Sequence, residues 1–293
     1  MGHMTVAYIA FQKLDPAVKP KVHELLKINP DYPAWVQGIA QTNQDERLLI
    51  AFLRASVWAD DIKVKPDYTS DGSEGGNVPP QLPASSQNRG YEDKLRHQYW
   101  HFHDKPFSGD GTPVQQPITP SALTQIPVLR AALKDSPSIF IRSYDLVWLI
   151  HLVGDIHQPL HATSRFTANQ VNGDAGGNGL KLSARRSARI PSLHSFWDGL
   201  AGTSEIEDAI ALGNALMNEA GEPSGTNVTD VAKWIDESFQ LARRFAYAPP
   251  IRPDGSVSLT NSAYRRNAKD VADKQVVLAG YRLARLINEA LRP

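Results

Sequence analysis

Residues 139–161 read IFIRSYDLVWLIHLVGDIHQPLH, an apolar run that ends in three histidines and an aspartate. From Ile139 to Val153 the run is apolar on nearly every face, which predicts a central, buried helix. His151 and Asp155 lie four residues apart and therefore share one face of that helix. A buried ionised carboxylate is costly unless it is paired or bound to a metal. The pair is thus either a structural hydrogen bond or part of a metal site.

Two further features favour a metal site. Pro159 does not fit a helix interior, so His161 is expected to turn back after the helix end and need not bind the same ion as His151. His194 and Asp198 form a second pair with i, i+4 spacing in LHSFWDGL. Two His/Asp pairs and an additional histidine suit more than one zinc ion.

Each of the other candidate ligands, when taken alone, is weak evidence for a metal site. They lie near predicted helix ends: Asp60 in SVWADDIK, His101 in YWHFHD and His3 in GHMTVAYIA. His157 follows His151 by six residues and points elsewhere, so we interpret it as a structural residue and not as a ligand. His23 and His97 stand in amphipathic contexts and are predicted to lie on the surface.

The composition limits the possible functions. Of the 293 residues, 31 are Lys or Arg and 31 are Asp or Glu, so the formal net charge is zero. A protein that binds nucleic acid mainly through phosphates is usually basic, so phosphate recognition here must be local or must come from bound cations. Because the chain has no cysteine, disulfides and thiolate zinc sites are excluded. No apolar stretch has the length of a membrane span, and the sequence is not expected to include a signal peptide.

The rest of the chain shows mostly helical periodicity and almost no alternating strand pattern. Helices are predicted at residues 4–14, 17–28, 45–60, 91–102, 121–134, 137–158, 191–200, 204–220, 228–248 and 261–291. Asp15-Pro16 and Ser136-Pro137 are each expected to form a helix cap followed by Pro at the first helical position. KLSARRSARI, residues 181–190, could form a short strand or hairpin.

Two segments rich in Gly, Asn and other turn-forming residues interrupt the helices. Residues 63–90 and 164–181 are predicted to be surface loop insertions. No internal repeat or domain boundary is evident in the sequence. We therefore expect one all-α, mostly helical domain over residues 1–293 with two long loop insertions.

Six sequence blocks together resemble a known family. In chain order they are GHMTVAYIA, SVWADD, WHFHD, HLVGDIHQPLH, GGN and LHSFWDG. They resemble the zinc-dependent single-strand-specific nucleases of fungi, plants and bacteria, the nuclease S-one/P-one family, and they span the chain from His3 to Asp198. HLVGDIHQPLH is highly specific, and more so in combination with LHSFWDG. The resemblance implies the all-α zinc phospholipase C/nuclease fold and three zinc ions.

The resemblance also implies a set of ligands for each ion. The first zinc would be bound by Asp60, His101, His151 and Asp155, the second by His161, His194 and Asp198, and the third by His3 and a bridging oxygen of Asp155. In the family an N-terminal Trp supplies the remaining ligands of the third ion. This sequence has no Trp before His3, and the α-amino group of Met1 is the substitute that it offers.

Catalytic roles follow from the same resemblance. Two cations about 3.5–4 Å apart can neutralise phosphodiester oxygens and lower the pKa of a bridging water toward 7. Asp60 would align this water, and departure of the 3′ oxygen would leave a 5′-phosphate product. Lys63 stands where the family usually has Arg and would offset transition-state charge as a point donor. The alternative for Lys63 is an ordinary solvated lysine.

Three residues are candidates for substrate binding. Phe102 resembles the stacking aromatic of the family, Asp104 matches the residue that hydrogen-bonds a base edge, and Asn178 would help to hold substrate or a loop. Stacking tolerates any base but needs an unstacked one, which favours single strands. The alternative for Phe102 is a position in the core. A basic stretch could guide a phosphate backbone or form a solvated face: Lys181, Arg185, Arg186 and Arg189.

Three functions are compatible with the sequence. The first is a zinc endonuclease that cuts single-stranded DNA and RNA, with 3′-nucleotidase activity on 3′-nucleotides. The second is a zinc phospholipase C, and the third is a noncatalytic zinc-binding helical protein. Asp198, where phospholipases C usually have Glu, and the HFHD block favour the nuclease. No membrane or obligate protein partner is evident, and the resemblance implies a periplasmic or secreted protein.

Overall fold

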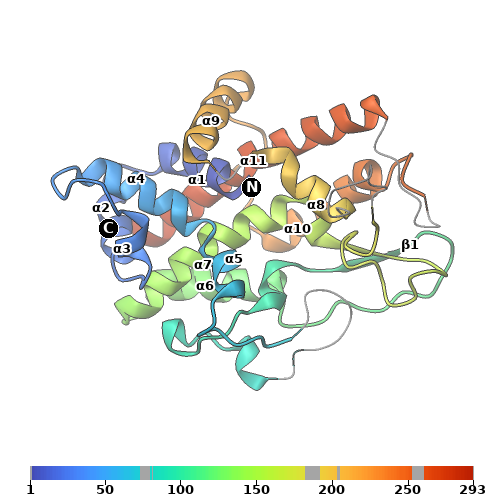
Figure 1. Cartoon of the computed structure of the whole chain (residues 1–293), viewed down its shortest axis with the longest axis horizontal. Coiled ribbons are helices and arrows are strands. Elements are labelled where there is room, and N and C mark those ends of the chain that lie inside the picture. Colours follow the sequence, from blue (N-terminus) through green and yellow to red (C-terminus); the bar gives the residue numbers. More distant parts are fainter. Residues whose placement is uncertain are drawn as a thin grey trace.

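The computed structural model describes residues 2–72, 80, 82–181, 192–202, 205–252 and 261–292. Helices dominate, and the described part of the chain contains two short strands (Figure 1). This confirms the expected fold class, a single domain that is mostly helical. None of the helices within the described ranges combines the length and the apolar character needed to span a lipid bilayer.

The helices follow one another with few strands between them. The α-helices are α1 (Gly2–Lys13), α2 (Lys19–Leu26), α3 (Tyr32–Trp35), α4 (Gln44–Ala55), α5 (Trp58–Asp61), α6 (Ala122–Asp135), α7 (Ile139–His157), α8 (Leu193–Asp198), α9 (Ile206–Ala220), α10 (Val231–Leu241) and α11 (Ser262–Leu291). A π-helical turn, Ala242–Ala246, extends α10. The strands β1 (Lys105–Ser108) and β2 (Thr163–Phe166) are parallel, with Lys105 opposite Thr163.

Helix α7 runs through the middle of the molecule, where α1, α6, α10 and α11 pack against it (Figure 1). Every residue from Ser143 to Val153 is buried, which confirms the prediction of a central helix. Its first turn is capped by Ser138, whose Oγ accepts a hydrogen bond from the Ile141 backbone N–H. The predicted start at Ser136-Pro137 was therefore two residues too early.

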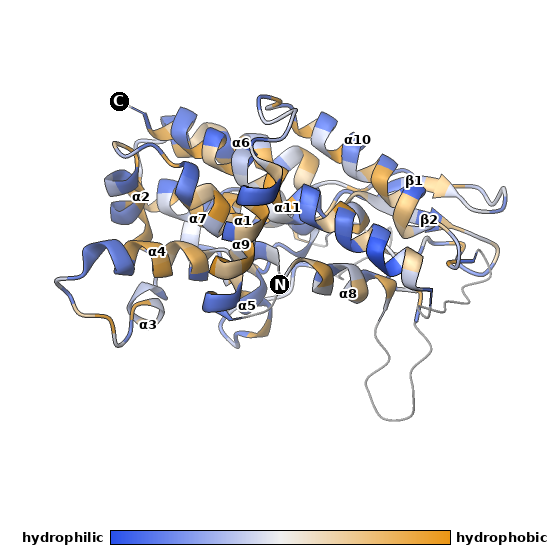
Figure 2. Ribbon diagram, turned by 90° about the horizontal axis from the view of Figure 1, so that it is seen from above, coloured by the Kyte–Doolittle hydropathy of each residue, from blue (hydrophilic) through white to orange (hydrophobic). Residues whose placement is uncertain are grey.

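The surrounding helices turn apolar faces toward this centre. In α10 the buried residues are Val231, Trp234, Ile235, Ser238 and Phe239, which follow the i, i+3, i+4, i+7, i+8 pattern of one helix face. The ribbon of α10 accordingly alternates between hydrophobic and hydrophilic segments (Figure 2). Helix α1 lies between α9 and α11, and this position places its first residues beside the end of α7.

An aromatic cluster fixes the short helix α5 against α7. Trp58 makes edge contacts with Tyr68, Tyr91, Tyr144 and Trp148, with ring centroids between 5.7 and 6.1 Å apart. Such aromatic pairs contribute about 0.5–1.5 kcal/mol each beyond the burial of their surface. Because Asp60 follows Trp58 by two residues in the same helix, the cluster also determines where Asp60 lies.

The helix predicted at residues 91–102 is wrong. The chain there forms two 3-10 turns, Gly90–Glu92 and Gln98–His101, and His97 between them has a φ of +44°. His97 was predicted to lie on the surface but is fully buried, with its ring stacked on Trp100 and its Nε2 3.1 Å from Asp93 Oδ2. These buried polar and aromatic contacts hold an irregular backbone that periodicity alone does not indicate.

The surface position predicted for His23 is also wrong. Its side chain is buried, and its Nε2 lies 2.8 Å from the Tyr32 hydroxyl. The Asp15 cap differs from expectation as well. Helix α2 begins at Lys19 after a turn, although the Asp15 carbonyl still accepts hydrogen bonds from the backbone N–H groups of Val18 and Lys19.

The helix predicted at 45–60 is divided into α4 and α5. Helix α4 ends at Ala55, and the next residue, Ser56, donates a hydrogen bond of 2.6 Å from its Oγ to the Leu53 carbonyl. Of the predicted insertion 63–90, the structure describes residues 63–72, 80 and 82–90, which include the 3-10 turn Pro83–Ser86. The insertion 164–181 contains most of β2, a strand that was not predicted. Of the possible hairpin at 181–190, only Lys181 lies within the described residues, where it forms a single bridge with Ser192.

Candidate active site

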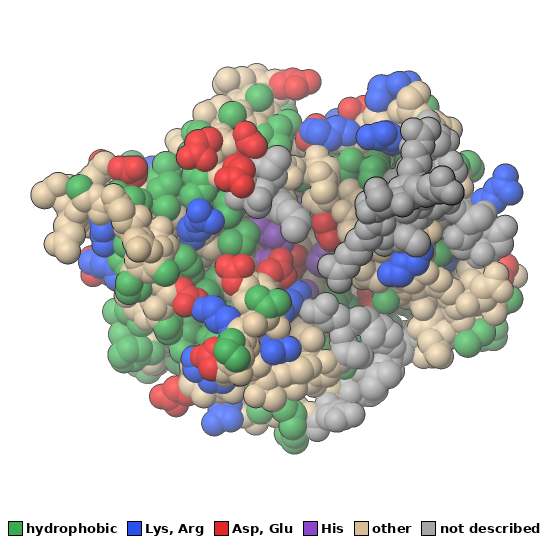
Figure 3. All heavy atoms as spheres, in the orientation of Figure 1, with side chains coloured by type: hydrophobic (Ala, Val, Ile, Leu, Met, Phe, Trp, Pro, Cys, Tyr) green, Lys and Arg blue, Asp and Glu red, His purple; other side chains and the backbone are tan. Residues whose placement is uncertain are grey.

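The predicted ligands come from six parts of the chain. His3 is on α1, Asp60 on α5, His151 and Asp155 on α7, and His194 and Asp198 on α8, while His101 and His161 are in 3-10 turns. Six of these residues line one cavity of about 300 Å³: His3, Asp60, Asp155, His161, His194 and Asp198. Figure 3, which shows the face seen in Figure 1, has histidine side chains near its centre, with acidic side chains beside them. Met1, the ninth predicted ligand, lies outside the described residues.

The first group of side chains converges on one carboxylate oxygen. Asp155 Oδ2 lies 2.9 Å from His101 Nδ1 and 3.0 Å from His151 Nε2. The two ring nitrogens are themselves 3.0 Å apart. Asp60 Oδ1 approaches from α5, at 3.8 Å from His151 Nε2 and 4.0 Å from His101 Nδ1. The structure thus brings together all four residues predicted for the first ion.

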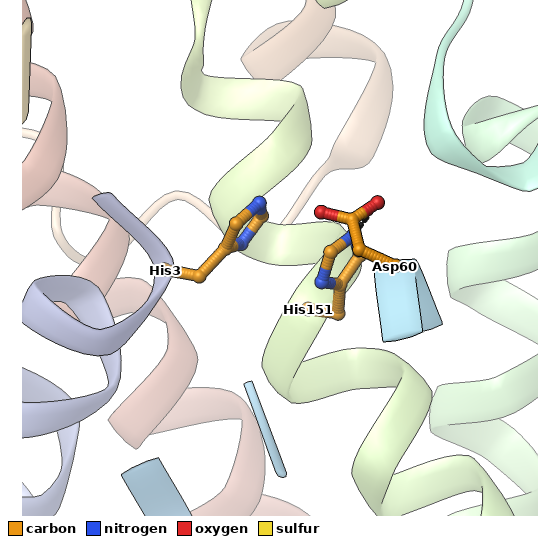
Figure 4. A group of neighbouring side chains, drawn as sticks. All are labelled: His3, Asp60 and His151. Carbon is orange, nitrogen blue, oxygen red and sulfur yellow. Dashed lines mark ion pairs between the residues drawn. The ribbon is translucent and has the colours of Figure 1, made fainter. Parts of the chain in front are cut away.

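His3 approaches the other side of the same carboxylate. Its Nε2 lies 3.2 Å from Asp155 Oδ1, and its ring stacks on that of His151 at a centroid distance of 4.0 Å. Figure 4 shows the two rings nearly parallel, with the Asp60 carboxylate beside them. Asp155 therefore presents Oδ2 to one group and Oδ1 to His3, which is the arrangement that a bridging carboxylate needs.

The third group lies where α8 faces the end of α7. His161 Nε2 is 3.7 Å from Asp198 Oδ1, and His194 Nε2 is 3.6 Å from Asp198 Oδ2. Asp198 Oδ1 also accepts a hydrogen bond of 2.8 Å from Gln158 Nε2. His161 turns back after Pro159, as predicted, so it belongs to a different group from His151.

Backbone carbonyls orient three of the histidines. The Nδ1 atoms donate to carbonyl oxygens: His151 to Ser56 at 2.7 Å, His161 to His101 at 2.8 Å and His194 to Gly176 at 2.9 Å. Each ring then presents its Nε2 to the carboxylates, and in the deprotonated ring this atom is free to bind an ion. Metal-binding histidines usually donate their second ring N–H to such a partner.

These residues fit zinc. Within each group the donor atoms lie within 4.8 Å of one another, and all are imidazole nitrogens or carboxylate oxygens. Four-coordinate zinc accepts these ligands. When the side chains are grouped by this distance alone, His151 belongs to two groups. These groups are His3 with Asp60 and His151, His101 with His151 and Asp155, and His161 with His194 and Asp198.

The ionisable side chains of the site shift one another's pKa values. Burial alone would raise the pKa of Asp155, but His151, His161 and His3 hold it well below its usual value. Burial lowers the pKa of His101 to about 3, so this ring is neutral and able to bind a metal. Although burial acts against its charge, Asp155 and Asp198 raise the pKa of His161 to about 9. In the metal-free protein His161 therefore carries a proton that an ion must displace.

A smaller pocket of about 70 Å³ adjoins the cavity. It brings together Lys63 and the three residues predicted to bind substrate, Phe102, Asp104 and Asn178. Phe102 is half-buried and lines this pocket, so it is not a core residue. Lys63 forms an ion pair of 2.9 Å with Asp60 and is therefore not simply solvated.

Gln98 also lines this pocket, and sequence reasoning missed it. Its Oε1 lies 2.7 Å from Ser70 Oγ, which holds the side chain in place. The one signal in the sequence was its position three residues before His101. Of the basic stretch, Lys181 is exposed, and Arg185, Arg186 and Arg189 lie outside the described residues.

His157 belongs to none of the three groups, as predicted, although it lines the cavity. Its Nδ1 donates to the Val153 carbonyl at 2.7 Å, and its Nε2 accepts a hydrogen bond of 2.9 Å from Arg282. Burial and the Arg282 charge lower the pKa of His157 to about 3. The neutral ring ties the end of α7 to α11, and both of its nitrogens are occupied.

A helical domain that gathers three His/Asp groups around a cavity, beside a pocket with an accessible aromatic ring, is typical of metal-dependent hydrolases of phosphate esters. The chain matches the S1/P1 Nuclease family over residues 1–292, and it belongs to this family. The protein is thus a nuclease, a hydrolase that acts on phosphodiester bonds, and the family is zinc-dependent.

Individual relatives are similar over different parts of their lengths. The chain is 24% identical to Nuclease P1 of Penicillium citrinum, in an alignment that covers 99% of this chain and 96% of that protein. Nuclease PA3 of Penicillium sp gives the same identity and coverage. Endonuclease 4 of Arabidopsis thaliana is 29% identical over 49% of each chain, so that match spans about half of the plant protein.

Proposed function

We propose that the protein is a zinc-dependent endonuclease that cuts single-stranded DNA and RNA to 5′-phosphate products and that also acts on 3′-nucleotides. The observation that carries this proposal is the junction of the two pockets. Lys63, His161, Asn178 and His194 line both the large cavity and the small pocket. A base in the small pocket would therefore place the phosphate on its 3′ side among the candidate metal ligands.

The three groups would hold three zinc ions. Asp60, His101, His151 and Asp155 would bind the first, and His161, His194 and Asp198 the second. His3 and Asp155 Oδ1 would bind the third, together with the N-terminal residue Met1. Bound zinc supplies Lewis-acid stabilisation of phosphate oxygens and lowers the pKa of water toward 7.

Asp60 and Lys63 are the proposed catalytic side chains. Burial acts to raise the pKa of Asp60, but His151, Lys63 and His101 hold it far below its usual value. The ionised carboxylate can accept a hydrogen bond from the attacking water and align it with the phosphorus. Lys63 Nζ, 2.9 Å from Asp60 Oδ1, places a positive charge at the junction of the two pockets, where a phosphate would develop additional negative charge.

The small pocket would select single strands. A base must leave its helical stack to lie against Phe102, and this unstacking costs least in a single strand. Asp104 would hydrogen-bond the edge of the inserted base, and Asn178 would contact the nucleotide at the junction. Stacking contributes about 1–3 kcal/mol per base and accepts all bases, which is consistent with cleavage of both DNA and RNA.

We also propose that the protein acts in the periplasm or is secreted, as the resemblance implies, and that it needs no membrane or obligate protein partner. The chain has no cysteine, so its folding does not depend on disulfide formation in the periplasm or outside the cell.

One set of assays tests the proposed activity. The zinc-loaded protein is incubated with single-stranded DNA, duplex DNA, RNA, a 3′-mononucleotide and phosphatidylcholine, each with and without a chelator. We expect chelator-sensitive cleavage of the single strands and the 3′-mononucleotide, with 5′-phosphate ends on the polymer products. Turnover of phosphatidylcholine alone would identify a phospholipase C. No turnover of any substrate by protein that carries zinc would identify a noncatalytic zinc protein.

A further inference from the structure

The segment that directly follows β2 closes around one buried carboxylate. Asp174 Oδ1 accepts three hydrogen bonds, from Arg165 N at 2.9 Å, Gly177 N at 3.2 Å and the Tyr247 hydroxyl at 2.9 Å. The Asp174 backbone is held as well, since its N–H donates to the Arg165 carbonyl and its own carbonyl accepts from Gly179 N. We name residues 174–179 the Asp174 loop.

The Asp174 loop supplies the hydrogen-bond acceptor of one candidate ligand. Gly176 O accepts the Nδ1–H of His194 at 2.9 Å. Gly176 has a φ of +61°, and a Cβ at this position would lie 2.2 Å from the Leu160 carbonyl oxygen. The loop therefore packs directly against the turn that follows α7. Gly177, which directly follows Gly176, donates its backbone N–H to Asp174 Oδ1, so the anchor at Asp174 holds the backbone that carries the Gly176 carbonyl.

The other two side chains of this group have their hydrogen-bond partners outside the loop. His161 donates to the His101 carbonyl at 2.8 Å, and Asp198 accepts from Gln158 at 2.8 Å. Gln158 and His161 belong to the turn after α7, and His101 to an adjacent 3-10 turn. Within the group His161, His194 and Asp198, His194 is thus the residue whose hydrogen-bond acceptor lies in the Asp174 loop.

The Tyr247 hydroxyl connects this loop to a distant helix. Tyr247 follows the π-helical turn after α10, and its ring packs on Phe107 of β1 at a centroid distance of 5.1 Å. The Arg165 guanidinium lies over the same ring at 4.7 Å. These contacts hold the ring independently of its hydroxyl, so removal of the hydroxyl would free the loop anchor without moving the tyrosine ring.

We propose that Asp174 and Tyr247 are positioning residues for His194. Through the Asp174 loop they fix Gly176 O, which holds the His194 ring with Nε2 toward Asp198 and so completes the group that would bind the second zinc. This inference rests on the proposed function. Asn178 belongs to the same loop, where its Nδ2 donates to the Ala175 carbonyl at 3.0 Å, so the anchor also determines the wall shared by the two pockets.

The test uses Tyr247→Phe, which removes one of the three donors to Asp174, and Tyr91→Phe as the matched control. The Tyr91 hydroxyl also has two hydrogen-bond partners, Ser143 and Asn29, and both lie outside the loop. Zinc affinity is measured by competition with a chelator, together with zinc per chain and thermal unfolding. Loss of an orienting partner typically weakens metal binding by about 10–100-fold. We expect a loss of about tenfold at one site in Tyr247→Phe, none in Tyr91→Phe, and recovery of kcat at excess zinc.

A double-mutant cycle with His194→Ala identifies the affected site. If Tyr247 acts through His194, Tyr247→Phe has no further effect on zinc affinity in the His194→Ala background. Asp174→Asn serves as a second variant of the same anchor and should also weaken one site.

Wild-type zinc affinity in both Tyr247→Phe and Asp174→Asn would overturn the inference. An undiminished effect of Tyr247→Phe in the His194→Ala background would do so too. A wild-type protein that binds no zinc would overturn the proposed function and this inference together. Zinc binding and nuclease activity in the wild type with unchanged anchor variants would overturn the inference alone.

Discussion

Gly154 and His3 are in direct contact across the α1–α7 interface, and a Cβ at position 154 would lie 2.7 Å from His3 Nδ1. The glycine sits in the last turns of α7, directly before Asp155. A side chain here would push His3 away from the Asp155 carboxylate, which it approaches to 3.2 Å. The smallest residue is thus what allows two helices to share one carboxylate.

Gly154→Ala should therefore damage the site and not the helix. Alanine is favoured over glycine in a helix interior by about 1 kcal/mol, so a loss of function cannot come from helix propensity. We expect displacement of His3, loss of about one zinc per chain and a fall in kcat/KM of about 10–100-fold. Gly199→Ala is the control, because a Cβ at Gly199 meets no atom within 4 Å although the residue follows Asp198. Equal activity of both variants would contradict the steric argument.

Asp155→Asn should remove both metal and activity. The carboxylate faces His101 and His151 with one oxygen and His3 with the other, and an amide lacks the charge to serve both sides. We expect zinc per chain to fall by at least one and kcat/KM to fall at least about 100-fold. Full activity of the purified variant, at wild-type zinc content, would refute the bridging role.

Asp145 also lies on α7, but its pKa is shifted in the direction opposite to that of Asp155. Burial raises the pKa of Asp145 to about 8, above the value of 3.8 for an unperturbed Asp. The folded state thus retains a proton that the unfolded state has lost. The corresponding stability is fully present below pH 4 and is lost progressively as the pH rises toward 8.

Asp145→Asn removes this titration. Urea unfolding should show that the free energy of unfolding of the wild type falls relative to Asp145→Asn between pH 4 and pH 8. The slope should reach at most about 1.4 kcal/mol per pH unit. Parallel pH profiles of the two proteins would show that Asp145 does not titrate in this way. Zinc content should be unchanged, because Asp145 does not line the cavity.

Asp104 should give the enzyme a pH-dependent base preference. Burial and the nearby Asp174 charge raise the pKa of Asp104 to about 8, against the effect of His161. Below this pH the neutral carboxyl can donate to adenine N1 while it accepts from the amino group. Above it the carboxylate only accepts, which suits the N1–H and amino group of guanine.

The ratio of kcat/KM for adenine and guanine substrates should therefore fall as the pH rises from 6 to 9. A ratio cancels titrations that affect both substrates equally, such as those of the candidate metal ligands. Asp104→Asn keeps one donor and one acceptor and does not ionise, so its ratio should be independent of pH. A wild-type ratio that stays constant over this range would exclude Asp104 from base contact.

Zinc binding should release protons. Asp155 and Asp198 raise the pKa of His161 to about 9 in the metal-free protein, despite its burial. At pH 7.5 an ion must displace this proton before His161 can bind it. Calorimetric titration in buffers of different ionisation enthalpy should show release of about one proton at the second site, and His161→Ala should abolish it. Binding without buffer dependence would contradict the assignment.

Local sequence patterns were sufficient to predict much of the architecture. The apolar run up to Val153 predicted α7, because a helix without a polar face must be buried. Helical spacing paired His151 with Asp155 and His194 with Asp198, and both pairs are close in space. Pro159 predicted the turn that separates His161 from His151.

Long-range contacts account for what the sequence did not reveal. The parallel pairing of β1 with β2 joins residues nearly 60 positions apart, and four-residue strands carry almost no periodic signal. His97 looked like a surface residue, but Asp93 and Trp100 enclose it. The roles of Gln98 and Asp174 depend on which loops meet at the site, which spacing along the chain does not specify.

The interruption between α4 and α5 has a consequence for the neighbouring helix. In a continuous helix the Ser56 carbonyl would accept from the backbone N–H of Asp60, but that N–H bonds to Val57 instead. The Ser56 oxygen is thereby released from helical hydrogen bonding and is available to His151. The interruption between α4 and α5 thus determines which ring nitrogen of His151, on α7, carries the proton. A continuous helix would remove this control, although no candidate ligand would change.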